Sequence, residues 1–266
     1  MLKRRIIPFL PIRDGKIVKG VHFTGMRNPN DPIEAVAAYD TQGADEVFLC
    51  DESTTQEGHR RFIDVLTRLS TQSFLPITVA GDIRDENNVV AMIRAGADKV
   101  AINDAAISHP PIAEQWVKQF GASTIVAEIT VKRIHPQPHD LNPMAEVIIH
   151  QGTRPTGLEA ITWSLQLNRL GVGELYVRSI DRDGNKDGYD LWLIRSIAAS
   201  VSIPVVAGGG VGTVEHIRQG LADDGGQANG ALVGTFFHFG LNTIDQAKQY
   251  LDQHGIPVRL SNSNSA

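Results

Sequence analysis

The segments ThrValAlaGlyAspIle (78–83) and ValValAlaGlyGlyGlyVal (205–211) each carry a short apolar run that ends at glycine. A second pair follows in the same order, ValAlaIleAsnAspAla (100–105) and AlaLeuValGlyThrPhe (231–236). Apolar, β-branched runs that stop at glycine are typical of buried strands. The recurrence of both segments indicates a chain built from two related halves.

Short apolar runs alternate with helical patterns along the rest of the chain. Segments 33–40 and 88–96, for example, carry apolar residues at helical spacing and end near glycine. This alternation predicts an α/β fold, a (β/α)8 barrel of two fused half-barrels, as a single domain over residues 1–260. A doubly wound open sheet is the alternative. The eight expected strands lie near residues 6–12, 46–51, 75–81, 98–103, 123–130, 174–180, 203–208 and 230–235.

Two excursions interrupt this rhythm, after the first and the fifth expected strand. Residues 13–20 are expected to form a hairpin, because AspGly favours a tight turn between extended residues. Residues 131–157 form the matching excursion, with a strand at 147–150 and a loop at 152–157. Their equivalent positions support the organisation in two halves. The last residues, 261–266, are expected to be a disordered tail.

Composition excludes several classes of partner. The 266 residues are 42% hydrophobic, and a net charge of −5 with scattered Lys and Arg offers no basic surface to nucleic acid. Cys50 is the single cysteine, and no apolar run approaches the ~20 residues of a membrane span. We expect a soluble, cytoplasmic protein with no nucleic acid, no membrane and no cofactor. We also expect no metal site, because prolines keep His135 and His139 off a common helix face.

A run of glycines follows the seventh expected strand. Phosphate commonly binds (β/α)8 barrels at the loops after strands 7 and 8. Glycine lets backbone N–H groups approach an anion closely, and a helix N-terminus adds favourable charge. We therefore expect Gly209, Gly210, Gly234 and Thr235 to bind the phosphate of a small molecule. A tight turn is the alternative explanation for the glycine run.

The equivalent loops of the first half carry acids instead. Asp82 stands opposite Gly210, and Asp104 stands opposite Thr235. Each carboxylate near a phosphate dianion would cost on the order of 1–4 kcal/mol. We expect Asp82, Asn103 and Asp104 to form an altered site that binds a cation, hydroxyls or an amine. Helix capping is the alternative, because both aspartates precede helical segments.

Four further motifs are distinctive: MetLeuLysArgArgIleIlePro (1–8), AspGlyLysIleValLysGly (14–20), GlyAlaAspLysValAlaIleAsn (96–103) and SerIleAspArgAspGlyAsnLysAspGlyTyrAsp (179–190). Together they resemble one family, the cyclase subunit of imidazole glycerol phosphate synthase, HisF. The last of these motifs separates the family from its sister isomerase, HisA. The resemblance extends from Met1 to about Leu260 and implies a (β/α)8 barrel.

The resemblance also implies a reaction, in which ammonia attacks a bisphosphate substrate that is then cyclised and cleaved. In the family, two aspartates at the ends of strands 1 and 5 act as general acid and base. The matching positions here are Pro11 and Thr130, which cannot fill those roles, so the resemblance implies a divergent member of the family. Glu128 shares a strand face with Thr130 and is a candidate substitute, or else a buried structural partner. The other candidate catalytic residues match family positions: Lys19, Asp51 and Asp183. Surface hydration or loop capping is the alternative for Asp51 and Asp183.

At the opposite end of the barrel, the resemblance implies a gated ammonia channel. The family's ring of charged gate residues corresponds here to Arg5, Glu46, Lys99 and Glu174. In the family this ring admits ammonia from a glutaminase of the HisH type, which docks at the N-terminal face, and Asp98 matches a position that contacts it. An ion-pair ring that closes the barrel floor is a compatible structural explanation.

Three hypotheses follow from the sequence. The first is a HisF-like subunit of a glutamine amidotransferase complex that receives or conducts ammonia, with its original cyclase chemistry lost or altered. The second is an active cyclase of histidine biosynthesis whose acid–base residues have moved. The third is a binding protein for a monophosphorylated metabolite.

Overall fold

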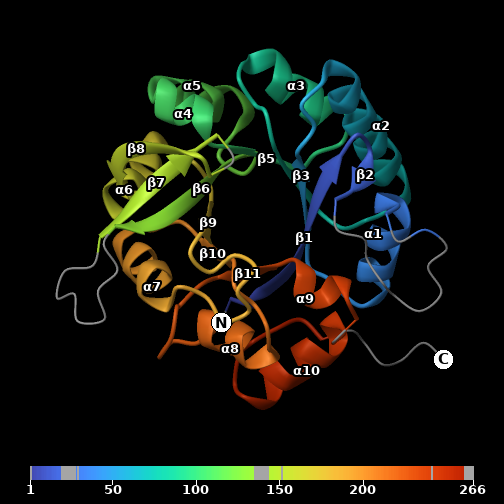
Figure 1. The fold of residues 1–266 in the computed structure, drawn as a ribbon, viewed down its shortest axis with the longest axis vertical. Helices are drawn as coiled ribbons and strands as arrows, with labels where there is room; N and C mark the ends of the chain where they lie inside the picture. The colour runs from blue at the N-terminus through green and yellow to red at the C-terminus, as the bar shows by residue number, and fades with distance from the viewer. Residues whose placement is uncertain are drawn as a thin grey trace. The chain divides into compact units, whose positions relative to one another are not determined.

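The computed structural model of the chain describes residues 2–18, 28, 30–134, 144–150, 152–240 and 242–260 (Figure 1). The strands are β1 (Arg5–Arg13), β2 (Lys16–Ile17), β3 (Val47–Asp51), β4 (Ile77–Ala80), β5 (Lys99–Ile102), β6 (Ile125–Ile134), β7 (Met144–Ile149), β8 (Arg154–Glu159), β9 (Leu175–Ser179), β10 (Val205–Gly208) and β11 (Gly230–Val233). The helices are α1 (Pro32–Thr41), α2 (Gln56–Gln72), α3 (Glu86–Arg94), α4 (Asp104–Ser108), α5 (Pro111–Phe120), α6 (Ala160–Leu170), α7 (Leu191–Ser200), α8 (Val214–Leu221), α9 (Thr235–His238) and α10 (Ile244–Gln253).

The fold is a (β/α)8 barrel, as the alternation in the sequence predicts. Strands β1, β3, β4, β5, β6, β9, β10 and β11 overlap the eight expected segments, and helices separate them along the chain. The pairs β1–β3, β3–β4, β4–β5, β6–β9 and β9–β10 are parallel. Antiparallel strands follow the first strand of each half, β2 after β1 and β7 with β8 after β6. The two halves therefore share one plan.

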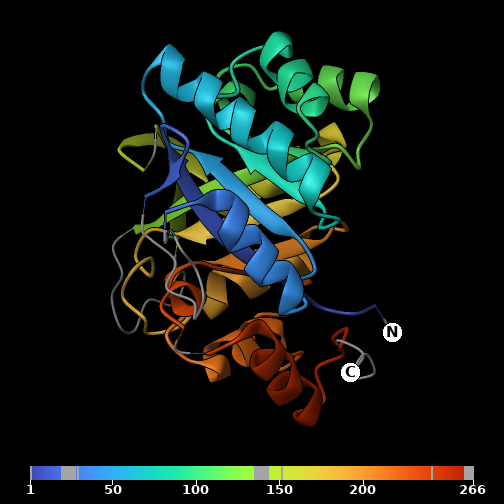
Figure 2. The ribbon, with the colours of Figure 1, turned by 90° about the vertical axis from the view of Figure 1, so that its right-hand side faces the viewer.

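Contacts divide the chain into two compact units, a first unit of Met1–Val100 with Ala231–Ala266 and a second unit of Ala101–Gly230. In the first unit, β1 lies between β3 and β11, and β4 pairs with β3. Helices α1 and α2 contact each other and β1. Both views show these helices on the same side of β1 and β3 (Figures 1 and 2).

The AspGly turn forms the expected hairpin. Ile12 pairs with Ile17 across β1 and β2, and Asp14 and Gly15 have φ angles of 52° and 78°. Two positive φ angles in succession are typical of a two-residue hairpin turn. A Cβ on Gly58 would lie 2.3 Å from Asp14 Oδ1, so the turn packs against the start of α2. Residues 19 and 20 of the expected hairpin lie outside the described residues.

In the second unit, β9 lies between β6 and β10, and β6 continues into an antiparallel sheet with β7 and β8. Helices α6 and α7 contact each other in this unit (Figure 1). The expected loop at 152–157 is wrong in its second part, because β8 begins at Arg154. Pro155 pairs with Ile148 at the end of the strand order, where a residue without an N–H is tolerated.

An arginine joins the end of β6 to α7. Arg133 donates from Nε and Nη2 to the two carboxylate oxygens of Asp190, at 2.7 and 2.6 Å. Asp190 Oδ1 also caps α7 by accepting from the Leu193 N–H at 3.1 Å. The Arg133 guanidinium lies 4.1 Å from the centre of the Trp192 ring. This bidentate and stacked geometry fixes the second-unit loop that carries residues 179–190.

A buried lysine joins α10 to the start of the sheet in the first unit. Lys248 Nζ donates to Gly43 O at 2.6 Å and to Asp45 Oδ1 at 2.7 Å. Burial lowers the pKa of Lys248, and the charge of Asp45 acts in the opposite direction. Asp45 Oδ2 also accepts from the Ile6 N–H at 2.8 Å, so one carboxylate connects α10 with β1.

Large apolar side chains fill the interior of each unit. Phe48 and Phe62 in the first unit and Trp116 in the second are at most 1% exposed. Burying a side chain of this size contributes about 1.5–3 kcal/mol relative to exposure. Among the described residues, no helix has both the length and the apolar character needed to cross a membrane.

Candidate functional site

The C-terminal end of β3 carries a buried aspartate that holds a histidine from the next helix. Asp51 is the last residue of β3, and its side chain is 1% exposed. Its Oδ2 accepts a hydrogen bond from His59 Nδ1 at 2.7 Å, and its Oδ1 accepts one from the Ser53 N–H at 3.0 Å. Because a carboxylate only accepts hydrogen bonds, Nδ1 carries the proton, and the lone pair of the neutral ring is therefore on Nε2. His59 is 28% exposed, so Nε2 can accept a proton at this end of the strand.

Asp82 lies on the other side of the same histidine. Its Oδ2 is 4.0 Å from His59 Nε2, and its Oδ1 accepts from Arg84 Nε at 2.5 Å. This hydrogen bond and the charge of Asp82 raise the pKa of Arg84. Helix α3 is capped instead by Asp85, whose Oδ1 accepts from the Asn88 N–H at 3.0 Å. The carboxylate of Asp82 therefore faces a guanidinium and an imidazole of the chain itself.

Glu46 is the centre of a polar network at the N-terminal ends of strands in the first unit. Its Oε2 accepts from Arg5 Nη1 and from Lys99 Nζ, both at 2.9 Å. Its Oε1 accepts from Thr78 Oγ1 at 2.5 Å. Glu46 is 2% exposed, and a buried carboxylate requires such partners because an unpaired buried charge costs several kcal/mol. Three of the four expected gate residues thus lie in one network, together with Thr78.

Glu174, the fourth expected gate residue, belongs to the second unit. It precedes β9, is 4% exposed, and accepts a hydrogen bond from the Tyr176 hydroxyl at 3.0 Å. Asp98, the expected interface residue, precedes β5 in the first unit and accepts from the Ile77 N–H at 2.8 Å. Asp98 thereby connects the starts of β4 and β5.

In the second unit, Thr130, the residue that the motif resemblance matches to the family's strand 5 aspartate, lies opposite an arginine. Thr130 of β6 is the register partner of Arg178 of β9, and Arg178 is the register partner of Gly208 of β10. Glu128 forms an ion pair with Arg178, with 3.5 Å between Oε1 and Nε. Glu128 and Thr130 are 6% and 5% exposed. Glu128 therefore balances a guanidinium and is not an isolated carboxylate beside Thr130.

The glycine loop after β10 packs tightly against the loop after β9. Gly209 and Gly210 have φ angles of 89° and 98°, where a side chain is strained. A Cβ on Gly209 would lie 2.9 Å from Ser179 O, and a Cβ on Gly210 would lie 2.2 Å from Gly188 O. The Gly188 N–H also donates to Gly210 O at 2.8 Å. Loop packing therefore accounts for these glycines, and the tight-turn explanation stands beside phosphate binding.

The other expected phosphate residues lie at the start of α9 in the first unit. Gly234 is the N-cap of α9, and Thr235 is its first residue. A Cβ on Gly234 would meet Phe9 at 3.7 Å, an ordinary contact. The two pairs of expected phosphate residues thus belong to different units. Only the pair after β10 is required to be glycine by close packing.

Asp104 binds the β7–β8 hairpin in the second unit. Its Oδ2 accepts from the His150 backbone N–H at 3.1 Å and lies 3.0 Å from His150 Nδ1. Asp104 is the first residue of α4, and the N-cap position is occupied by Asn103, which makes no side-chain capping bond. Asn103 precedes it, and its Oδ1 is buried without a hydrogen-bond partner among the described residues. Helix capping therefore does not explain Asp104, and its partner is the imidazole of the chain.

A comparison with protein families gives one result that bears on these sites. The model of the family described as Histidine biosynthesis protein matches residues 5–243. The chain belongs to this family. The match agrees with the motif resemblance at the level shared by the HisA and HisF barrels.

In this member of the histidine biosynthesis family, the remaining predicted residues lie at separate places. Pro11 is buried and pairs in register with Cys50, so β1 supplies no titratable group at that position. Asp183 is exposed in the loop after β9. Lys19 lies outside the described residues, as do the histidine pair at 135 and 139 and the tail at 261–266. Among the residues that the structure describes, no group of three or more His, Cys, Asp or Glu side chains could hold a metal ion.

Two residues of the candidate sites in this family member were not predicted from the sequence. His59 lies eight positions after Asp51 on the next helix, a separation that only the β3–α2 turn explains. Arg178 sits in the otherwise apolar run LeuTyrVal of β9. A charged residue inside a buried strand was the available signal, because such a residue needs a partner on the same face.

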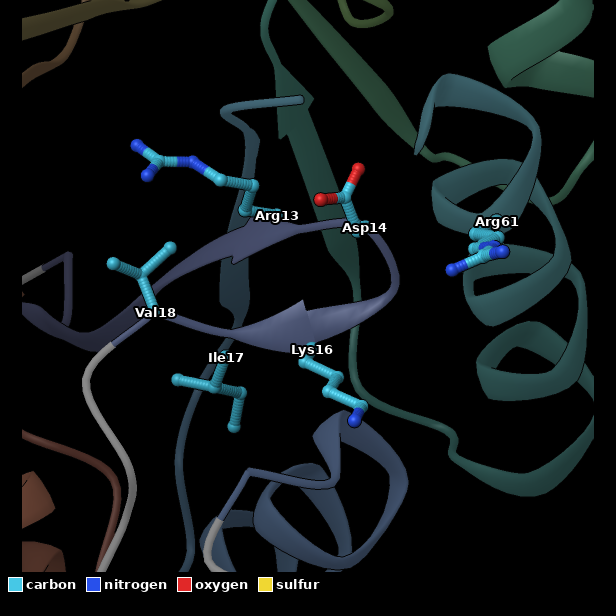
Figure 3. A pocket seen from close by; sticks show the side chains of 6 residues that line it. All are labelled: Arg13, Asp14, Lys16, Ile17, Val18 and Arg61. Atoms are coloured by element: carbon cyan, nitrogen blue, oxygen red, sulfur yellow. The ribbon is translucent and has the colours of Figure 1, made fainter. Parts of the chain in front are cut away.

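A pocket of about 410 Å³ lies at the β1–β2 hairpin of the first unit (Figure 3). Arg13 at this pocket pairs with Glu52, and Arg61 pairs with Glu57. Both arginine side chains are more than half exposed, 53% and 57%, so water screens their charge. The pocket is therefore a solvated surface feature. Its lining consists of Arg13, Asp14, Lys16, Ile17, Val18 and Arg61.

Proposed function

We propose that this chain is the HisF-like subunit of a glutamine amidotransferase complex and receives ammonia from a glutaminase. The observation that carries the proposal is the network around Glu46, where Arg5 and Lys99 converge on one buried carboxylate oxygen. These residues lie at the N-terminal ends of strands, away from the end where (β/α)8 barrels bind substrate. A buried charge cluster held at that end is consistent with a gate.

The original cyclase chemistry is lost or altered in this proposal. Pro11 has no titratable group, and Thr130 lies opposite Arg178 instead of presenting a carboxylate. Each missing acid–base role costs a factor of ~10²–10⁴ in rate. The ligand of the barrel mouth is a phosphorylated small molecule, consistent with the glycine loop after β10 and the adjoining N-terminus of α8.

An active cyclase with relocated acid–base residues is the second candidate, and one observation favours it. The pair of Asp51 and His59 places a buried carboxylate behind an imidazole at the C-terminal end of β3. This arrangement is the one in which histidine commonly transfers protons. Asp82, 4.0 Å from Nε2, could stabilise the charged ring.

The deciding experiment measures consumption of the ribulosyl bisphosphate substrate of HisF cyclases by the purified protein, with saturating ammonium. Ammonium bypasses the glutaminase, so the assay reports on the barrel alone. We expect no turnover above background. Turnover near that of an ordinary cyclase would overturn the loss of cyclase chemistry and leave the second candidate, in which case His59→Asn should abolish it.

A matched variant checks that the substrate still reaches the site. Pro11→Asp combined with Thr130→Asp returns carboxylates to both family positions. We expect this double variant to turn over more substrate than the parent. Equal, negligible rates for both proteins would mean that more than these two groups was lost.

A further inference from the structure

The row of Thr130, Arg178 and Gly208 crosses three adjacent strands of the second unit, β6, β9 and β10. Gly208 is the last residue of β10 and Arg178 the penultimate residue of β9, whereas Thr130 lies near the middle of β6, which continues to Ile134. Neighbouring strands are about 4.8 Å apart, so the row spans roughly 10 Å. Gly208 leads directly into the glycine loop proposed to bind phosphate. Arg178 is the charged residue of β9, and it lies in register with Gly208, at the start of that loop.

The polar residues of this row share one face of the sheet. Glu128, Thr130 and Arg178 alternate with apolar residues such as Ile129 and Val177, which are at most 1% exposed. Helices α5 and α6 contact β6, and the apolar set is suited to pack under them. The polar set lies on the other face, which is the substrate-binding side of a (β/α)8 barrel at these strand ends.

The guanidinium of Arg178 pairs with Glu128 and is partly exposed. Glu128 approaches its Nε edge at 3.5 Å, and the Arg178 side chain is 21% exposed. A guanidinium presents five N–H donors in a rigid fork that matches a carboxylate. Because Glu128 already balances the charge of Arg178, a singly charged carboxylate meets less repulsion here than a phosphate dianion does.

We propose that Arg178 recognises a carboxylate on the ligand, next to the phosphate bound by the glycine loop. The ligand class is then a phosphorylated carboxylic acid and not a bisphosphate. This inference rests on the phosphate binding in the proposed function. Arg178, which faces Thr130, carries a charge opposite to that of the family's strand 5 aspartate. In this proposal the site recognises an anion instead of transferring a proton.

A pair of probes of the same carbon length tests the inference. Glycerol 3-phosphate and 3-phosphoglycerate differ by a hydroxymethyl group and a carboxylate, and isothermal titration calorimetry gives the affinity for each. We expect the parent protein to prefer 3-phosphoglycerate by about tenfold or more, since hydrogen bonds to charged groups are of that strength. Arg178→Met should remove the preference while leaving the affinity for glycerol 3-phosphate unchanged.

Two further variants serve as controls for the role of Arg178. Arg182→Met removes one positive charge from the adjoining loop, where Arg182 pairs with Asp187 at 2.8 Å, and should keep the preference. Glu128→Gln combined with Arg178→Met avoids an unpaired buried carboxylate, and should lose the preference as the single variant does.

The outcomes separate this inference from the proposed function. Equal affinities of the parent for both probes, or an unchanged preference in the Arg178→Met variant, would overturn the role of Arg178 and leave phosphate binding intact. Failure of both probes to bind the parent would overturn the inference together with the phosphate site. Reception of ammonia is tested independently by glutaminase docking.

Discussion

At the scale of single residues, Asp51 holds two groups at once, the His59 ring and the Ser53 N–H. Both bonds are made by a side chain that is 1% exposed. Removing a buried acceptor leaves its donors unsatisfied, which costs about 1–3 kcal/mol. The same residue thus orders the β3–α2 turn and sets the tautomer of the histidine.

We expect Asp51→Ala to lower the free energy of unfolding by about 1–3 kcal/mol, measured by urea denaturation. Asp64→Ala is the matched control, because Asp64 is exposed on α2 and should change stability by less than about 0.5 kcal/mol. Equal effects of the two substitutions would show that the buried bonds of Asp51 contribute nothing to stability.

Some features of single residues are predictable from the sequence and others are not. The motif resemblance predicts that Pro11 and Thr130 stand at the positions of the two family aspartates. The contacts of Glu128 with Arg178 and of Asp82 with His59 were not predictable, because strand register and the turn into α2 bring these residues together. Pairings between elements depend on packing geometry, which no local pattern in the sequence encodes.

At the scale of elements, the loops after β9 and β10 form one packed unit around Gly210. Its φ of 98° excludes most side chains, and a Cβ there would lie 2.2 Å from Gly188 O. Gly184 in the same pair of loops has a φ of 83° with nothing within 4 Å of a Cβ. The two glycines thus share backbone strain and differ in the space around them.

Gly210→Ala is expected to destabilise the protein by at least about 2 kcal/mol more than Gly184→Ala, because only the first adds a steric clash to the strain. Thermal unfolding of both variants gives the comparison. If both lose the same stability, positive φ alone explains the requirement for glycine at position 210, and the close approach of the loops is not a constraint.

The strands of the barrel were predictable from sequence, and one excursion strand was not. Apolar runs such as 46–51 and 203–208 overlap β3 and β10, because buried parallel strands are nearly continuous apolar segments. β8 contains Pro155 and Gly157, two residues that usually end strands. It forms at the end of the strand order, where pairing on one side is sufficient.

At the scale of the whole molecule, the proposed complex requires a docking surface at the N-terminal ends of the strands. Phe74 lies in the segment between α2 and β4 of the first unit, and its side chain is fully exposed. It therefore lies at the same end of the strands as Glu46 and Lys99. Exposed aromatic side chains commonly contribute a large share of interface affinity.

We expect Phe74→Glu to weaken binding of a HisH-type glutaminase by about tenfold or more, measured by calorimetric titration. Phe239→Glu is the matched control, since Phe239 is 45% exposed but follows α9, after the C-terminal end of β11. Equal weakening by both substitutions, or none by Phe74→Glu, would contradict docking at the N-terminal end.

The contact between the loops after β9 and β10 has a consequence for transplantation between barrels. Gly209 and Gly210 fit only against a neighbour whose backbone follows the path of Ser179 and Gly188. A donor loop grafted alone would meet a foreign partner at van der Waals distance. Exchange of ligand preference among such proteins therefore has to move residues 179–190 and 208–212 as one cassette.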